Sequence, residues 1–257
     1  MALLDCHFFA ESLGMSMSMK VILPEETSVQ GEGEGKTAEG RIRTLYLLHG
    51  LSDDDSIWCR RTSIERYVAG LGLAVVMPNV HRSFYSDMKD GYRYWSFLSE
   101  ELPRKVKTLF HLSDRREDNF VAGLSMGGYG AFKLALNHPD RFAAAASLSG
   151  CLDLASRFRD PDASGSGDLR LAFGNASGFA GSNGDLFPLA ESLVKSGTAI
   201  PRLFQCCGTE DELHDENQRF REHALKLGLG LVYEEGPGGH SRAYWDKMIQ
   251  RALSFML

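Results

Sequence analysis

The stretch Phe120-Val121-Ala122-Gly123-Leu124-Ser125-Met126-Gly127-Gly128-Tyr129-Gly130 determines the fold class of this chain. A short apolar run is followed at once by helical periodicity, so the segment predicts a strand, a tight turn and a helix. At its centre, Gly123-Leu124-Ser125-Met126-Gly127 matches G-x-S-x-G. Such a turn needs small residues on either side of the serine, because the helix passes close to the strand. Ser125 is therefore a candidate nucleophile, with a helix N-cap as the structural alternative.

Short apolar runs alternate with helical patterns on both sides of this segment, which predicts a mostly parallel sheet covered by helices on both faces. The expected strands cover residues 44–48, 73–77, 120–122, 142–148, 201–206 and 231–233. The expected helices cover residues 64–70, 94–110, 126–137, 215–227 and 241–255. Pro103 should end or kink the second of these helices. The fold class is therefore α/β.

Three regions lie outside this alternation. Residues 3–10 and 16–23 are rich in strand-forming residues and flank the turn signal Ser12-Leu13-Gly14, which predicts an N-terminal antiparallel hairpin. Residues 25–40, rich in Gly and Glu, should form a solvated loop. Residues 151–198, rich in Gly, Ser and Asp, are expected to form an irregular, lid-like insertion after a strand. We expect residues 1–257 to form a single domain.

The composition argues against several classes of protein. The chain has 257 residues, a formal net charge of −6 and 43% hydrophobic residues, which are ordinary values for a globular protein. Its mild acidity and lack of basic blocks argue against nucleic-acid and membrane partners. No apolar run reaches the ~18 residues of a membrane span, and the first ten residues do not resemble a secretory signal. The five cysteines lack CxxC spacing, so we expect free thiols, no structural metal and a cytoplasmic location.

A nucleophilic serine needs a general base. In serine hydrolases with this turn, a carboxylate and then a histidine follow the serine in the chain. His240 follows the last expected strand in Gly236-Pro237-Gly238-Gly239-His240, on a flexible loop at the edge of the sheet that carries Ser125. His138, His214 and His223 fall on or beside helices, where solvated or helix-end positions are the usual explanation. His240 is therefore the predicted base.

The carboxylate that orients the base is expected after the penultimate strand, in Gly208-Thr209-Glu210-Asp211. Asp211 is favoured because it leaves the strand on the tight turn. Glu210 is a close alternative, and Asp215 a weaker one. The chosen carboxylate would hold the imidazole tautomer and stabilise the imidazolium that forms when Ser125 attacks.

Two backbone amides should form the oxyanion hole. One belongs to the residue after the nucleophile, Met126. The other is expected from His49-Gly50-Leu51, at the end of an earlier strand, where the glycine lets the backbone turn inward and makes the Leu51 amide the second donor. His49 precedes Ser125 in the chain, and we interpret it as a structural residue. This chemistry implies no metal and no organic cofactor.

With these motifs in place, the sequence resembles the esterase D group of α/β-hydrolases, and closely the tributyrin-esterase-type short-chain esterases within it. The resemblance spans most of the chain and is carried by Leu47-Leu48-His49-Gly50-Leu51, Ile57-Trp58, Arg61-Thr62, Val75-Val76-Met77-Pro78-Asn79, Gly91-Tyr92, Glu100-Glu101-Leu102-Pro103, Ala122 to Gly130 and Cys207 to Asp211. It implies an α/β-hydrolase fold. It also implies the nucleophile at Ser125, the acid at Asp211 rather than Glu210, the base at His240, and the oxyanion donors at Leu51 and Met126.

The resemblance implies a serine carboxylesterase that hydrolyses acetyl to butyryl esters through an acyl-enzyme. Trp58 is a candidate substrate contact, as are Tyr85 and Trp95, although large aromatic residues more often belong to the core. Related formylglutathione hydrolases usually carry a cysteine just after the oxyanion-hole loop. Ser52-Asp53-Asp54 stands there, which favours oxygen esters over thioesters.

Other functions stay open at this point. S-formylglutathione hydrolysis and acyl transfer are the alternatives that would use the same three side chains, and a non-catalytic binding module is the alternative of another class. The expected partner is a small-molecule ester. A homodimer is expected only because it is the commonest oligomer.

Overall fold

In the computed structural model, which describes residues 1–25, 40–160 and 165–257, eight strands form one sheet in the order β1-β2-β4-β3-β5-β6-β7-β8. The strands are β1 (Ala2–Ala10), β2 (Met15–Leu23), β3 (Arg43–Leu48), β4 (Leu73–Pro78), β5 (Asn119–Leu124), β6 (Ala144–Leu148), β7 (Arg202–Gly208) and β8 (Leu231–Gly236). β2 is antiparallel to both β1 and β4, and all other neighbours are parallel. The predicted α/β-hydrolase arrangement with an N-terminal hairpin is confirmed.

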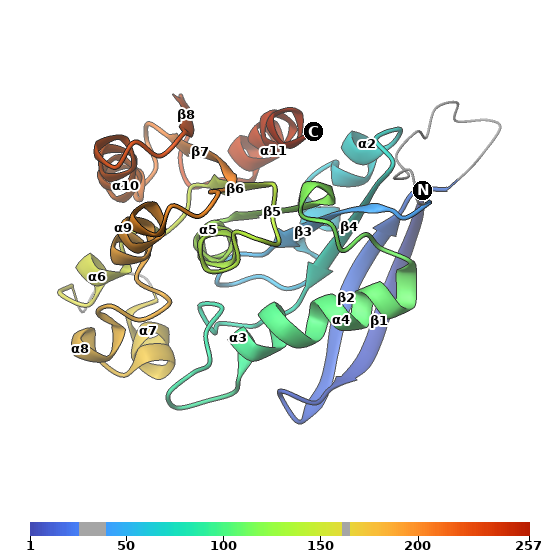
Figure 1. The fold of residues 1–257 in the computed structure, drawn as a ribbon, viewed down its shortest axis with the longest axis horizontal. Coiled ribbons are helices and arrows are strands. Elements are labelled where there is room, and N and C mark those ends of the chain that lie inside the picture. Colours follow the sequence, from blue (N-terminus) through green and yellow to red (C-terminus); the bar gives the residue numbers. More distant parts are fainter. Residues whose placement is uncertain (26–39, 161–164) are drawn as a thin grey trace.

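Helices cover both faces of this sheet (Figure 1). Buried side chains of α1 (Ile57–Arg61), α2 (Ile64–Val68) and α11 (Arg242–Met256) pack on one face. Those of α4 (Leu102–Phe110), α5 (Met126–Asn137), α9 (Leu186–Ser196) and α10 (His214–Lys226) pack on the other. The central strands β4 and β5 are buried along their whole length, as expected for parallel strands covered on both sides. Because β3 to β8 are parallel, their carboxyl ends lie at one edge of the sheet, where the loops that follow them can carry functional residues.

The helix predicted over residues 94–110 is interrupted. It consists of α3 (Tyr94–Ser96), a π-helical turn over Phe97–Glu101 and α4, whose first turn contains Pro103. Proline has no amide hydrogen to donate to the carbonyl four residues earlier, which belongs to Ser99. Arg141 donates to that carbonyl instead, with Nη1 2.6 Å from the oxygen. The predicted kink at Pro103 thus takes the form of a π-helical turn just before it.

The region over residues 151–198 is not irregular, contrary to the prediction. Its described residues form α6 (Leu154–Arg157), α7 (Ser166–Phe173), α8 (Ala176–Phe179) and α9. The remaining helix, over Arg116–Asp118, is a single 3₁₀ turn before β5. The solvated loop predicted for residues 25–40 lies almost wholly outside the described residues. None of the described helices is both long and apolar enough to cross a membrane.

Candidate active site

Ser125 lies at a sharp turn between β5 and α5. Its φ of 54° and ψ of −121° are rare for any residue other than glycine. A Cβ on Gly123 would lie 2.3 Å from the carbonyl oxygen of Gly127, and one on Gly127 would lie 2.4 Å from that of Leu48. The predicted steric need for glycine at both positions is therefore confirmed. Ser125 makes no side-chain capping hydrogen bond to α5, which argues against a mere N-cap role.

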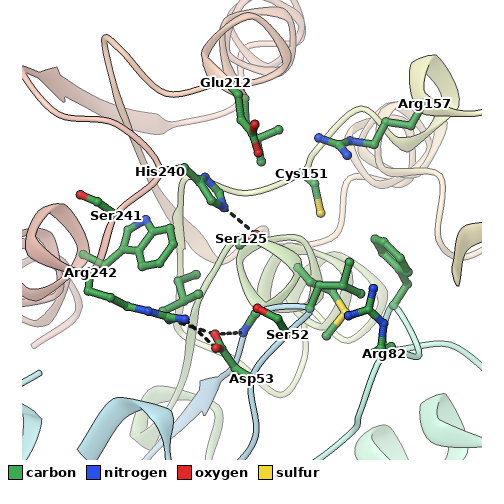
Figure 2. A pocket seen from close by; sticks show the side chains of 17 residues that line it. Ser52, Asp53, Arg82, Ser125, Cys151, Arg157, Glu212, His240, Ser241 and Arg242 are labelled. Carbon is green, nitrogen blue, oxygen red and sulfur yellow. Dashed lines mark hydrogen bonds and ion pairs between the residues drawn. The ribbon is translucent and has the colours of Figure 1, made fainter. Parts of the chain in front are cut away.

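The side chains of Ser125, His240 and Asp211 form one hydrogen-bonded chain. Ser125 Oγ lies 3.0 Å from His240 Nε2, and His240 Nδ1 lies 3.0 and 3.1 Å from the two carboxylate oxygens of Asp211. Because Nδ1 donates to the carboxylate, Nε2 carries the lone pair that can accept the serine proton. Ser125 follows β5, Asp211 follows β7 and His240 follows β8, so the carboxyl ends of three strands of the parallel part of the sheet bring them together. Figure 2 shows the bond between Ser125 and His240.

Asp211, not Glu210, faces His240. Burial opposes ionisation of Asp211, but hydrogen bonds from His240 and from the amide of Leu213, at 2.8 Å, hold its pKa below the ordinary value. Glu210 has a different task, because its carboxylate accepts a hydrogen bond from the amide of Gly238. Its own amide donates to the Gly238 carbonyl at 3.1 Å. Glu210 therefore ties the acid loop to the loop that carries His240.

His49 has the structural role predicted for it. Its Nδ1 lies 2.7 Å from the carbonyl of Gly50, and its Nε2 lies 3.0 Å from the amide of Val80. A carbonyl can only accept and an amide can only donate, so the neutral ring with hydrogen on Nδ1 satisfies both. Burial lowers the pKa of His49, which favours this neutral form. The ring thereby fixes the loop that leads to Leu51.

A cavity of about 540 Å³ opens around Ser125 (Figure 2). Its apolar lining consists of Leu51, Phe84, Leu124, Met126, Cys151, Leu213 and Trp245. Leu51 and Met126, the predicted oxyanion donors, line the same cavity as Ser125. Burial raises the pKa of the Cys151 thiol to about 12, so this second nucleophile at the cavity stays protonated at neutral pH.

Three arginines also line this cavity, and each is paired with a carboxylate. Nitrogen–oxygen distances are 2.8 Å for Arg82 with Asp168, 2.8 Å for Arg157 with Glu216, and 2.6 Å for Arg242 with Asp53. These pairings leave the cavity polar at its rim without a large excess of either charge.

The prediction that Trp58 contacts substrate is wrong. Trp58 lies on α1 with 1% of its surface exposed, packs in the core and is not part of the cavity lining. Its Nε1 donates to the Leu48 carbonyl at 3.0 Å, which satisfies the indole inside the protein. Tyr85 and Trp95 do not line the cavity either. Tyr85 is buried and donates to the His49 carbonyl at 2.7 Å.

Phe84 and Trp245 are the aromatic residues of the cavity, and sequence reasoning missed both. Trp245 lies in the first turn of α11, and its ring meets the His240 ring edge-on with centroids 4.8 Å apart. The only sequence signal for Trp245 is its position one helical turn after the predicted base. Phe84 precedes Tyr85 in a loop whose conformation no local pattern reveals.

Comparison with known proteins agrees with this geometry. The Esterase family profile matches residues 10–256. An acetyl esterase of Caldicellulosiruptor saccharolyticus is 29% identical over 263 residues, covering 100% of this chain and 98% of that protein. Two solved structures from Staphylococcus aureus each cover 99% of this chain and 98% of their own. They are FphF, a fluorophosphonate-binding serine hydrolase with substrate bound (36% identity, TM-score 0.88), and the S-formylglutathione hydrolase FrmB (37%, 0.86). The chain therefore belongs to the Esterase family and is a carboxylic ester hydrolase with the α/β-hydrolase fold.

Proposed function

We propose that the protein is a serine carboxylesterase that hydrolyses short-chain acyl esters, from acetyl to butyryl, through an acyl-enzyme on Ser125. The observation that carries this proposal is the hydrogen-bonded chain from Ser125 through His240 to Asp211. A serine on a strained turn, a histidine within 3.0 Å and a buried carboxylate behind it are the parts of a nucleophile, a base and an orienting group.

In the first half of the reaction, Ser125 Oγ attacks the ester carbonyl while His240 Nε2 accepts the serine proton. Asp211 stabilises the imidazolium that results. The amides of Leu51 and Met126 donate to the oxyanion of the tetrahedral intermediate. The intermediate collapses when the carbon–oxygen bond to the alcohol breaks and His240 gives its proton to the departing oxygen.

In the second half, water replaces the alcohol. His240 takes a proton from the water as its oxygen attacks the acyl carbon, and the same two amides stabilise the second oxyanion. Collapse breaks the bond to Ser125, whose oxygen regains a proton from His240. The products are one carboxylic acid and the free enzyme.

A chain-length series tests the class and the acyl limit together. We expect kcat/KM for p-nitrophenyl esters to be highest between acetate and butyrate, in agreement with the acetyl esterase relative. Ser125→Ala should lower the rate with p-nitrophenyl acetate by at least about a thousandfold, the usual effect of losing a nucleophile. Faster turnover of long acyl chains would contradict the short-chain proposal. A variant that keeps more than about a thousandth of the rate would contradict Ser125 as the nucleophile.

S-formylglutathione hydrolysis is the second candidate. It is favoured by the likeness to the S-formylglutathione hydrolase FrmB. Against it, Ser52-Asp53-Asp54 follows the proposed oxyanion donor Leu51 where related formylglutathione hydrolases usually carry a cysteine. Asp53 also forms an ion pair with Arg242, so this arginine is not available to a carboxylate of glutathione. A kcat/KM for S-formylglutathione more than about a hundredfold above that for p-nitrophenyl acetate would establish the thioester function. Transfer of acetyl to an added alcohol in preference to water would establish an acyltransferase.

We also propose a cytoplasmic location, which the cysteines support. All five, Cys6, Cys59, Cys151, Cys206 and Cys207, are free thiols. Free thiols are typical of a reducing compartment. A homodimer stays a prediction, and sedimentation of the purified protein would test it.

A further inference from the structure

We propose that a second hollow, beside the Ser125 cavity, binds a flat apolar group of the ester, such as an aromatic ring. This inference rests on the carboxylesterase function proposed above. The hollow has a volume of about 540 Å³ and shares Leu51, Ser52, Asp53 and Arg82 with the cavity around Ser125. Because the two spaces meet at residues 51–53, one ester molecule can place its carbonyl at Ser125 and a second group in the hollow.

The surface of the hollow is suited to an apolar ring. Tyr92 is 54% exposed and Leu171 is 48% exposed, although large apolar side chains usually lie inside a protein. Tyr92 and Tyr94 meet edge-on, with ring centroids 6.3 Å apart. Exposed apolar and aromatic side chains that gather in one concave place, next to a reactive group, are typical of ligand sites.

The wall that presents Tyr92 is tied by backbone hydrogen bonds to the opposite wall of the hollow. It belongs to residues 79–93 between β4 and α3, which run beside α7 (Figure 1). Within the loop, the Met88 amide donates to the Tyr92 carbonyl at 3.0 Å. The amide of Asp90 donates to the Leu171 carbonyl at 3.0 Å, which joins the loop to the helix that supplies the opposite wall. These hydrogen bonds hold the two walls of the hollow together.

Three residues of the same loop have a strained backbone conformation. His81, Phe84 and Tyr85 have φ values of 50°, 48° and 51°, a conformation that costs energy in residues other than glycine. Tertiary hydrogen bonds hold it: Tyr94 Oη lies 2.8 Å from His81 Nδ1, and Lys133 Nζ donates to the Tyr85 carbonyl at 2.8 Å. Strain maintained in this way clusters at binding sites. Of these strained residues, Phe84 lines the Ser125 cavity and His81 lines the hollow.

The charges around the hollow disfavour an anionic ligand. Arg82 is bound by Asp168 through two hydrogen bonds of 2.9 and 2.8 Å, and Asp53 is bound by Arg242. Asp90 adds a further carboxylate at the rim. An uncharged ring that packs on the tyrosine faces is the better complement, because aromatic pairs prefer edge-on or offset contacts of this kind.

Paired esters test the proposal. Benzyl acetate carries the ring on the alcohol, methyl phenylacetate carries it on the acyl group, and methyl acetate is the reference for both. We expect Tyr92→Ala to lower kcat/KM for one ring ester relative to methyl acetate by about five- to tenfold, with Leu171→Ala acting in the same direction. The affected ester identifies which half of the substrate occupies the hollow. Phe9→Ala, which removes an equally exposed aromatic ring from the hairpin strand β1, should leave both ratios unchanged.

A ratio that changes less than twofold for both ring esters in Tyr92→Ala would overturn the proposal. Calorimetric titration of benzyl acetate and methyl phenylacetate into Ser125→Ala protein supplies a readout that needs no turnover. Adding Tyr92→Ala to that protein should weaken binding of one ring ester by a similar factor, and unchanged binding of both would also overturn the proposal. Failure of the proposed esterase function gives a different result from failure of the hollow. In that case Ser125→Ala would still hydrolyse methyl acetate, whatever the ring-ester ratios in Tyr92→Ala.

Discussion

Replacing Arg242 by alanine removes the ion pair with Asp53. This pair joins the segment that carries the proposed oxyanion donor Leu51 to the segment that carries His240. Nη1 and Nη2 of Arg242 donate to the two carboxylate oxygens of Asp53 at 2.9 and 2.6 Å (Figure 2). Asp53 Oδ2 also accepts from the Gly50 amide at 3.3 Å, next to the proposed donor Leu51. Arg242 itself lies two residues after His240. We therefore expect the pair to set the position of the proposed oxyanion hole relative to the base.

The size of the effect follows from the burial of the two partners. A hydrogen bond to a charged group contributes about 1.5–3 kcal/mol, and a buried carboxylate left without its partner adds a further cost. The Asp53 side chain is only 5% exposed, but Arg242 is 34% exposed, so water replaces part of the lost interaction. We expect a loss of about 2 kcal/mol in the transition state, or about thirtyfold in kcat. KM should change little, because an oxyanion contact forms fully only in the transition state.

The assay is steady-state hydrolysis of p-nitrophenyl acetate by Arg242→Ala, Asp53→Ala and the double variant. The double-mutant cycle should show coupling, because each single change breaks the same pair. Arg251→Ala is the matched control, since Arg251 lies on the same helix and forms a similar two-bond pair with Glu234, on the strand β8. The positioning role of Arg242 is refuted if the kcat of Arg242→Ala stays within twofold of the wild-type value. It is also refuted if Arg242→Ala lowers kcat no more than Arg251→Ala does.

Three further predictions concern other residues of the protein. Burial lowers the pKa of Lys133 to about 7, so between pH 7 and 10 the unfolded chain binds more protons than the folded one. The free energy of unfolding should rise with pH by up to about 4 kcal/mol over that window, and urea titrations should show this contribution disappear in Lys133→Met. Asp211→Asn should lower kcat on the order of 10³- to 10⁴-fold at pH 7 while the protein still folds, which kinetics with near-ultraviolet circular dichroism would check. Trp58→Phe should reduce the melting temperature and leave KM for p-nitrophenyl acetate unchanged, whereas a several-fold rise in KM would return Trp58 to the substrate site.

Local sequence patterns were sufficient to predict the strands and turns that depend on residues close together in the chain. Apolar runs bounded by glycine and turn residues indicated the parallel strands, because a buried strand needs that pattern wherever it lies. The turn at Ser125 could be predicted for the same reason, since the two glycines that it requires lie within five residues, at Gly123 and Gly127. Boundaries were less accurate: β6 begins at Ala144, two residues later than predicted, because Phe142 packs in the core without pairing in the sheet.

The insertion after β6 was misjudged because its helices depend on distant contacts. α8 has only four residues, too few to show a periodic pattern. The rings of Phe158, Phe173 and Phe179 pack together, with the last two 5.0 Å apart, and this cluster stabilises helices that short segments would not form alone. The glycines and serines between them look like a loop when these contacts are unknown.

Contacts between segments far apart in the sequence explain the other differences. Trp58 follows the segment that carries Leu51, and Trp245 follows His240, so both tryptophans lie near predicted site residues. Only Trp245 lines the cavity, whereas Trp58 is buried in the core. Both helices cover the same face of the sheet, but Trp245 lies in the first turn of α11 against the His240 ring, whereas the Trp58 indole donates to the Leu48 carbonyl inside the core. The Asp53–Arg242 pair joins positions that no local spacing relates, so it appears only once the sheet brings the two loops together.

Peptide mapping after reaction with a fluorophosphonate is the most direct test of the central claim, that Ser125 is the nucleophile activated by His240. We expect a single phosphonylated peptide containing Ser125, loss of esterase activity in proportion to labelling, and no labelling of Ser125→Ala. His240→Ala should be labelled at least about a hundredfold more slowly, because the base that takes the serine proton is missing. Labelling at another residue, or full activity with Ser125 modified, would contradict the account.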